Sequence, residues 1–149
     1  MPSVFEVLGR DHQNVRRMLA ELEKGPTAAT GANDNHLMRR KKMVEELIIE
    51  ESRHEAVEEM YFWPTVRDRL DNGDELADTA TVQEQEGKEV LGRLTKLSVD
   101  QPEFEDLVFV FINAGRDHIA FEETKVWPPL RRTLTEGEAV RLGAQIAEA

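Results

Sequence analysis

The sequence predicts an all-α protein, an antiparallel up-down-up-down four-helix bundle with a short extra helix at its C-terminal end. Apolar residues recur at helical spacing in four long segments, turn-forming residues separate these segments, and no segment is a convincing strand. Long helices with short connections are typical of such bundles. Because 149 residues can bury a core of their own, we expect a single domain spanning residues 1–149.

The first predicted helix covers residues 3–25. Ser3 is a suitable N-cap, since its hydroxyl can accept a backbone hydrogen bond, and Gly25 followed by Pro26 predicts the helix end. The apolar residues that follow a helical period in this segment are Val4, Leu8, Val15, Leu19 and Leu22.

The second predicted helix runs from His36 to Leu70. Pro64 predicts a kink, because its ring removes one backbone hydrogen bond and crowds the preceding turn. We interpret the basic run at residues 39–42 as the exposed face of this helix. Its apolar positions are Met43, Leu47, Ile48, Met60 and Leu70.

The remaining helices follow two turns. Asp74 is the expected N-cap of a third helix that ends near Ser98. The fourth, residues 103–134, is the most apolar segment and is interrupted late by two prolines. Thr135 and Glu138 predict a capping box for the short last helix.

Composition excludes several classes of function. The net charge of -11 and the pI near 4.8 argue against binding to nucleic acid or to an anionic membrane surface. The absence of cysteine excludes thiol nucleophiles and iron–sulfur clusters. No targeting segment or membrane span is recognisable in the sequence, so we expect a cytoplasmic protein.

One pattern occurs twice in the sequence, with the same His, Ala, Glu, Glu, Trp and Pro at the same relative positions. HEAVEEMYFWP, which begins at His54, recurs as HIAFEETKVWP, which begins at His118. In each copy a histidine and a glutamate are four residues apart, so that on a helix both point to the same side. A buried, unpartnered carboxylate is unfavourable by several kcal/mol, roughly. We therefore expect Glu58 and Glu122 to bind a shared cation.

Other residues of the two stretches are not expected to bind the cation. We expect Glu59 and Glu123 to be solvated surface carboxylates, because each lies one step around the helix. We interpret Trp63 and Trp127 as structural residues that pack near the ends of the bundle.

The other helices supply further candidates. His12 lies on the apolar face of the first helix and is expected to join the site, whereas His36 lies several turns from His54 and is expected at the surface. The third helix has no histidine, and its spacing does not distinguish Glu84 from Glu86 as the inward carboxylate.

With these residues assembled, the chain resembles the hemerythrin-like family, also called the HHE cation-binding domain. The resemblance covers nearly the whole chain and rests on the RDH triplet ending at His12 and on the two His-x-x-x-Glu stretches that precede an aromatic residue and proline. It implies a single hemerythrin-like domain with two non-haem iron ions, bridged by two carboxylates and an oxo or hydroxo group.

The resemblance also assigns roles to the ligands. Glu58 and Glu122 correspond to the bridging carboxylates, His12 and His54 to ligands of one iron, and His118 to a ligand of the other. Two features depart from the family. Glu84 stands where the third helix commonly has a histidine, and Glu122 stands one residue before the usual aspartate of oxygen carriers. The expected metal ligands are His12, His54, Glu58, Glu84, His118 and Glu122.

The expected function is binding of, or reaction with, O2, peroxide or nitric oxide at a carboxylate-bridged di-iron centre. The alternative is an iron-sensing or iron-binding regulatory module without turnover, so enzymatic activity of peroxide-consuming or oxidase type stays open. Zinc or manganese could replace iron. A plain bundle with His–Glu hydrogen bonds and no metal is a third interpretation. We expect a monomer or weak homo-oligomer.

Overall fold

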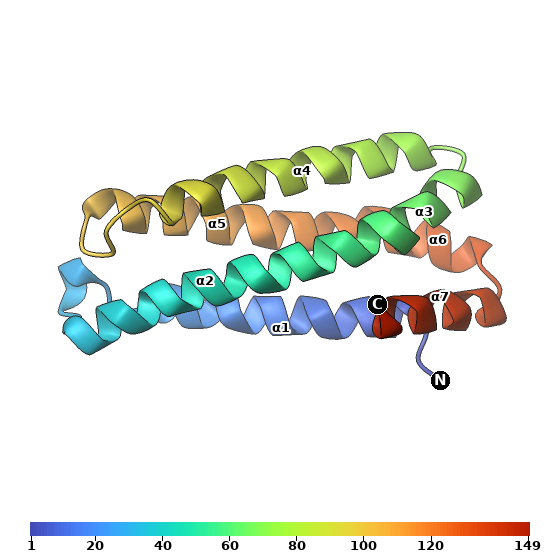
Figure 1. Ribbon diagram of the computed structural model, residues 1–149. Helices are drawn as coiled ribbons and strands as arrows, with labels where there is room; N and C mark the ends of the chain where they lie inside the picture. The colour runs from blue at the N-terminus through green and yellow to red at the C-terminus, as the bar shows by residue number, and fades with distance from the viewer.

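The structure is a computed structural model that describes residues 1–149, and every regular element in it is helical. Figure 1 shows four long helices lying along one axis: α1 (Val4–Lys24), α2 (Asp34–Val57), α4 (Gly73–Leu94) and α5 (Pro102–Phe121). α1 packs against α2 and α5, and α4 packs against α2 and α5, so each helix has two neighbours around the bundle. The predicted all-α four-helix bundle is confirmed. None of the helices combines enough length with enough apolar character to cross a membrane.

The shorter elements gather mainly at one end of the bundle. They are η1 (Ala28–Thr30), a 3₁₀ turn; η2 (Glu58–Phe62) and η3 (Glu122–Val126), both π-helical; and α3 (Trp63–Arg69), α6 (Trp127–Thr133) and α7 (Glu136–Glu148). α3 and α6 continue α2 and α5 beyond the π-helical turns, and α7 packs beside α1 (Figure 1).

Two predicted helix starts are confirmed by their capping boxes. At the start of α1, the Ser3 hydroxyl accepts from the Glu6 backbone N–H, and the Ser3 N–H donates to the Glu6 carboxylate. Thr135 and Glu138 make the same reciprocal pair at the start of α7. Each box satisfies backbone donors that a helix start leaves without partners.

The predicted bounds of the third helix were wrong at both ends. α4 begins at Gly73, after Asn72, so Asp74 lies in the first turn, where its negative charge suits the helix dipole. α4 ends at Leu94 rather than at Ser98, because the following backbone hydrogen bonds tighten to three-residue spacing.

The core consists of two apolar clusters separated by a layer of polar side chains. In α1, Leu8 belongs to one cluster and Val15 to the other, and the buried His12 lies between them. Buried polar residues occupy the corresponding place in α2, α4 and η3. Because unpaired polar groups are unfavourable inside a bundle, this layer marks the candidate functional region.

Two side chains of the second predicted helix differ from expectation. Arg40, in the basic run, is only 4% exposed, because its guanidinium donates to the Glu105 carboxylate at 2.9 and 2.6 Å and to the Leu22 carbonyl at 2.8 Å. Met60 is 62% exposed, although a continuous α-helical period placed it on the apolar face. It lies within η2, where the α-helical period is interrupted.

A test of the packing between α7 and α1 uses two glycines. A Cβ atom at Gly143 would lie 2.8 Å from backbone atoms of Ser3 and Val4, whereas one at Gly137 would meet nothing within 4 Å. We expect Gly143→Ala to lower the free energy of unfolding by about 1–3 kcal/mol. Gly137→Ala should leave it unchanged or raise it by up to about 1 kcal/mol. Urea denaturation followed by circular dichroism measures both, and equal stabilities would contradict the close packing.

Candidate metal centre

The repeated stretch forms two histidine–glutamate pairs, each on one side of its helix. Nε2 of His54 lies 3.1 Å from Oε1 of Glu58, and Nε2 of His118 lies 2.8 Å from Oε2 of Glu122. The four-residue spacing therefore brings donor atoms together within each copy, at the ends of α2 and α5.

A π-helical turn begins at each of these two glutamates. The Trp63 N–H donates to the Glu58 carbonyl and the Trp127 N–H to the Glu122 carbonyl, five residues back instead of four. The prolines that follow the tryptophans have no N–H to continue the regular ladder, and they lie in the first turns of α3 and α6. The backbone is thus widened where each carboxylate projects inward.

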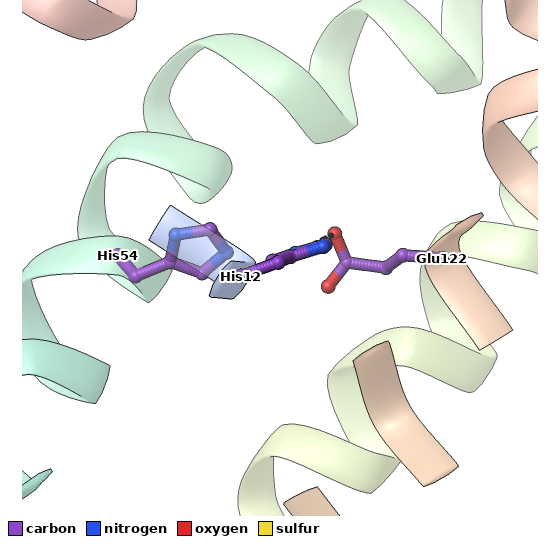
Figure 2. Close-up of side chains that lie close together, drawn as sticks. All are labelled: His12, His54 and Glu122. Carbon is purple, nitrogen blue, oxygen red and sulfur yellow. Dashed lines mark ion pairs between the residues drawn. The ribbon is translucent and has the colours of Figure 1, made fainter. Parts of the chain in front are cut away.

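The two remaining helices bring one ligand candidate each. From α1, Nε2 of His12 lies 3.5 Å from Oε1 of Glu122, and Figure 2 shows these side chains pointing toward each other. From α4, Oε1 of Glu84 lies 3.6 Å from Nε2 of His118. Glu84 is buried and Glu86 is exposed, so only Glu84 faces the site.

The six candidates form two overlapping groups, within each of which the potential ligand atoms lie no more than 4.8 Å apart. We call them the nitrogen-rich position, formed by His12, His54 and Glu122, and the oxygen-rich position, formed by Glu58, Glu84, His118 and Glu122. Glu122 belongs to both. The structure therefore brings all six predicted residues together, and it places one carboxylate where it could bridge two ions.

Most of the candidate ligand atoms do not form hydrogen bonds with one another, and their arrangement suits a bound cation better. Glu58 and Glu122 are 0% exposed, and both carboxylate oxygens of each lack a partner with hydrogen-bonding geometry. The Nε2 atoms of His12 and His54 also lack one, although carboxylate oxygens lie within 3.5 Å. Such unsatisfied buried groups are unusual, and imidazole with carboxylate is a donor set that binds iron, zinc or manganese.

Each imidazole ring is held from outside by its other nitrogen. Nδ1 of His12 lies 2.9 Å from Glu123, Nδ1 of His54 lies 3.1 Å from Asp11, and Nδ1 of His118 lies 2.8 Å from Gln83. With the proton on Nδ1, each neutral ring turns the lone pair of Nε2 inward, which is the arrangement of metal-binding histidines.

Two of the carboxylates behind the imidazoles were not predicted from the sequence. Glu123, expected to be solvated, accepts hydrogen bonds from both terminal nitrogens of Arg16 at 3.1 and 2.6 Å as well as contacting His12. Asp11, which accepts from Arg53 at 3.0 Å, was quoted only as part of the RDH triplet. Glu59 is exposed, in agreement with its interpretation.

The two tryptophans contact the site directly instead of only packing near the bundle ends. The Trp127 ring stacks on the His12 ring, with centroids 5.0 Å apart and planes 10° apart. Trp63 donates from Nε1 to Oε1 of Glu84 at 3.4 Å. Both rings are buried, so they restrict solvent and fix the side chains that they touch.

The charges of the cluster are strongly coupled. Burial and the neighbouring carboxylate of Glu122 raise the pKa of Glu58 well above its usual range. Burial also acts to raise the pKa of Glu122, but close contacts with His118 and His12 outweigh it and hold that pKa well below the usual range. Burial opposes protonation of His118, yet Glu122 and Glu84 raise its pKa to about 11. The metal-free cluster thus retains protons at neutral pH.

A small cavity lies beside the oxygen-rich position. Its volume is about 20 Å³, and His118, Gln83 and Glu84 form part of its wall. A space of this size accommodates one molecule about as large as water. The site therefore has room for a small ligand next to His118.

The sequence matches the family model described as Hemerythrin HHE cation binding domain over residues 3–130. No curated protein matches the chain significantly. Among solved structures, the chain is similar to a hemerythrin HHE cation binding domain-containing protein from Mycobacterium kansasii, with a TM-score of 0.82 and 21% sequence identity. That similarity covers 99% of this chain and 85% of the other, and it concerns the fold.

The metal-free protein should lose thermal stability as the pH rises. The pKa of His118 is raised from 6.5 to about 11, so the stabilisation from its protonated form is present below about pH 6.5 and is lost toward about pH 11. The melting temperature in chelator should fall between about pH 6.5 and about pH 9. Glu122→Gln should reduce this fall in melting temperature, because Glu122 helps to raise the pKa of His118. The surface variant Glu59→Gln should show the same fall as the wild type. A melting temperature that rises over this range would contradict the assignment.

Proposed function

This chain belongs to the hemerythrin HHE cation-binding domain family, and we propose that its six clustered side chains hold two non-haem iron ions. The proposed function is binding of, or reaction with, O2, peroxide or nitric oxide at this centre. The observation that carries the proposal is the position of Glu122, which belongs to both ligand groups and has two buried oxygens without hydrogen-bonding partners. A cation at each position would satisfy these oxygens.

The proposal gives each side chain a role. Glu122 would bridge the two positions, and Glu58, a member of the oxygen-rich position whose Oε1 lies 3.1 Å from Nε2 of His54, would be the second bridge. His12 and His54 would complete the nitrogen-rich position, and His118 and Glu84 the oxygen-rich position. When bound, the iron pair supplies one-electron and two-electron redox chemistry. The outer contacts of the three imidazoles hold their Nε2 atoms in place and keep the neutral tautomer that binds metal.

Glu84 shifts the expected chemistry from oxygen carriage toward reaction. Its carboxylate brings a negative charge where an imidazole would bring none, and anionic oxygen donors stabilise the higher oxidation state. Burial and the hydrogen bond from Trp63 keep that carboxylate turned toward the site. A donor set that favours ferric iron would suit the reduction of peroxide or O2.

A second candidate function is iron sensing without turnover, and one observation favours it. The ligand candidates come from α1, α4 and the adjoining ends of α2 and α5, so a bound metal would tie all four long helices together. Metal that binds only the folded state stabilises it, and its loss could expose a partner surface. The two functions share a site and differ in whether a substrate is consumed.

Metal content tests the site itself. The protein loaded anaerobically with Fe²⁺ and desalted should retain about two irons per chain. Glu122→Ala should reduce this to below about one iron, because both positions lose a ligand. After oxidation, the near-ultraviolet band of a bridged diferric pair should be absent in Glu58→Ala and present in the matched surface control Glu59→Ala. Equal iron content in all three variants would contradict the assignment.

Substrate consumption separates the two candidate functions. If the centre reacts, the iron-loaded protein should remove peroxide continuously over many equivalents, measured as loss of peroxide absorbance or release of O2. Glu122→Ala should lower the rate at least about tenfold through loss of metal. A melting temperature that rises with iron, without any consumption of peroxide, O2 or nitric oxide, would favour the sensor.

A further inference from the structure

We propose that the two metal positions differ in preference, so that the centre binds iron at the nitrogen-rich position and accepts manganese at the oxygen-rich position. In this proposal Glu84 is the residue that determines the selectivity. The inference rests on the proposed function, since it requires both positions to bind metal. It goes further by assigning a different metal chemistry to each position.

The two positions differ in their donor sets. With Glu58 counted as a bridge, the nitrogen-rich position offers two imidazole nitrogens and two carboxylates, whereas the oxygen-rich position offers one imidazole and three carboxylates. Imidazole suits iron and zinc, and carboxylate suits manganese, whose bonds to nitrogen are the weakest in the first-row series. The preference for iron over manganese is therefore larger at the position with more nitrogen donors.

The imidazoles of the two positions also differ in their outer hydrogen-bonding partners. His12 and His54 both face carboxylates through Nδ1, those of Glu123 and Asp11, and each of these carboxylates also accepts hydrogen bonds from an arginine. A carboxylate draws the Nδ1 proton and makes Nε2 a stronger donor. His118 faces the neutral amide oxygen of Gln83, so its Nε2 gains less. The outer layer thus enlarges the difference between the positions.

The side chain of Glu84 is fixed by its surroundings. The residue is buried, its Oε1 accepts from Nε1 of Trp63 at 3.4 Å, and the same atom lies 3.6 Å from Nε2 of His118. The carboxylate therefore cannot turn to solvent without leaving the indole N–H unpaired. Glu84 is therefore held as the third carboxylate of the oxygen-rich position.

The equilibrium distribution of two metals follows from these differences. Both positions prefer iron to manganese when tested alone, because affinity rises along the series. With one equivalent of each metal, however, two mixed arrangements compete: iron at the nitrogen-rich position with manganese at the oxygen-rich position, or the reverse. Their free energies differ by the amount by which the preference for iron over manganese at one position exceeds that preference at the other. Iron should then concentrate where its advantage is greater, at His12 and His54, and manganese should occupy the place beside His118 and Glu84.

The test is the metal identity at each position in crystals of the whole chain. The protein is equilibrated anaerobically with one equivalent each of Fe²⁺ and Mn²⁺, and anomalous diffraction is recorded on both sides of each absorption edge. The expected result is a ratio of iron to manganese several-fold higher at the nitrogen-rich position. Equal ratios at the two positions, or the reverse order, would overturn the proposal.

Two variants of α4 supply a matched comparison. Glu84→His replaces one of the three carboxylates by imidazole and should shrink the difference in metal ratio between the positions. Glu86→His adds the same side chain at an exposed place on the same helix and should leave the ratios of the wild type unchanged. A difference that persists in Glu84→His would remove Glu84 as the determinant.

The same crystals distinguish this proposal from the proposed function. If neither position contains metal, the proposed di-metal centre fails and takes the selectivity with it. If both positions contain metal in the same ratio, only the selectivity fails. Solution electron paramagnetic resonance gives a second readout, because a bound Mn²⁺ coupled to a neighbouring Fe²⁺ loses the six-line signal of isolated Mn²⁺.

Discussion

The burial of two carboxylates side by side is the constraint on which the rest of this structure depends. Glu58 and Glu122 are fully enclosed at the centre of the bundle, where an unneutralised pair of negative charges would be strongly unfavourable. Only protons or metal ions can neutralise them there. Imidazoles surround them, carboxylates lie behind His12 and His54, and arginines lie behind those carboxylates, Glu123 and Asp11. Two apolar clusters lie on either side of this polar layer along the length of the bundle.

The fold and the inward-facing candidates follow from periodicity. A helical repeat of apolar residues identifies the long helices, and a four-residue interval between histidine and glutamate identifies the side of the helix on which both lie. These rules place His12, His54 and His118 with Glu58 and Glu122 before any contact is known. These rules do not identify the ligand on α4, because Glu84 and Glu86 flank the predicted inner face on opposite sides. Only the rotation of the helix in the structure shows that Glu84 is the buried one.

The outer layer was harder to predict, because it depends on contacts between distant helices. The pairing of Glu123 with His12 joins residues 111 positions apart in sequence, and that of Arg40 with Glu105 joins residues 65 apart. The sequence predicts Glu123 and Arg40 to be exposed charged residues, which is reasonable for an isolated helix. Gln83 carries an uncharged amide, and nothing in the sequence marks it as a partner of His118. Long-range polar contacts of this kind have no local sequence pattern.

The π-helical turns restrict how this sequence can change during evolution. Each is equivalent to one residue inserted in an α-helix, immediately after the glutamate and before Trp-Pro. Deleting a single residue from residues 59–62 would restore the α-helical ladder and rotate the following segment by roughly 100°. The indole of Trp63 would then leave Glu84. Homologous chains should therefore tolerate substitutions within the segment but not insertions or deletions, and the length between histidine and proline becomes a signature as informative as the residues themselves.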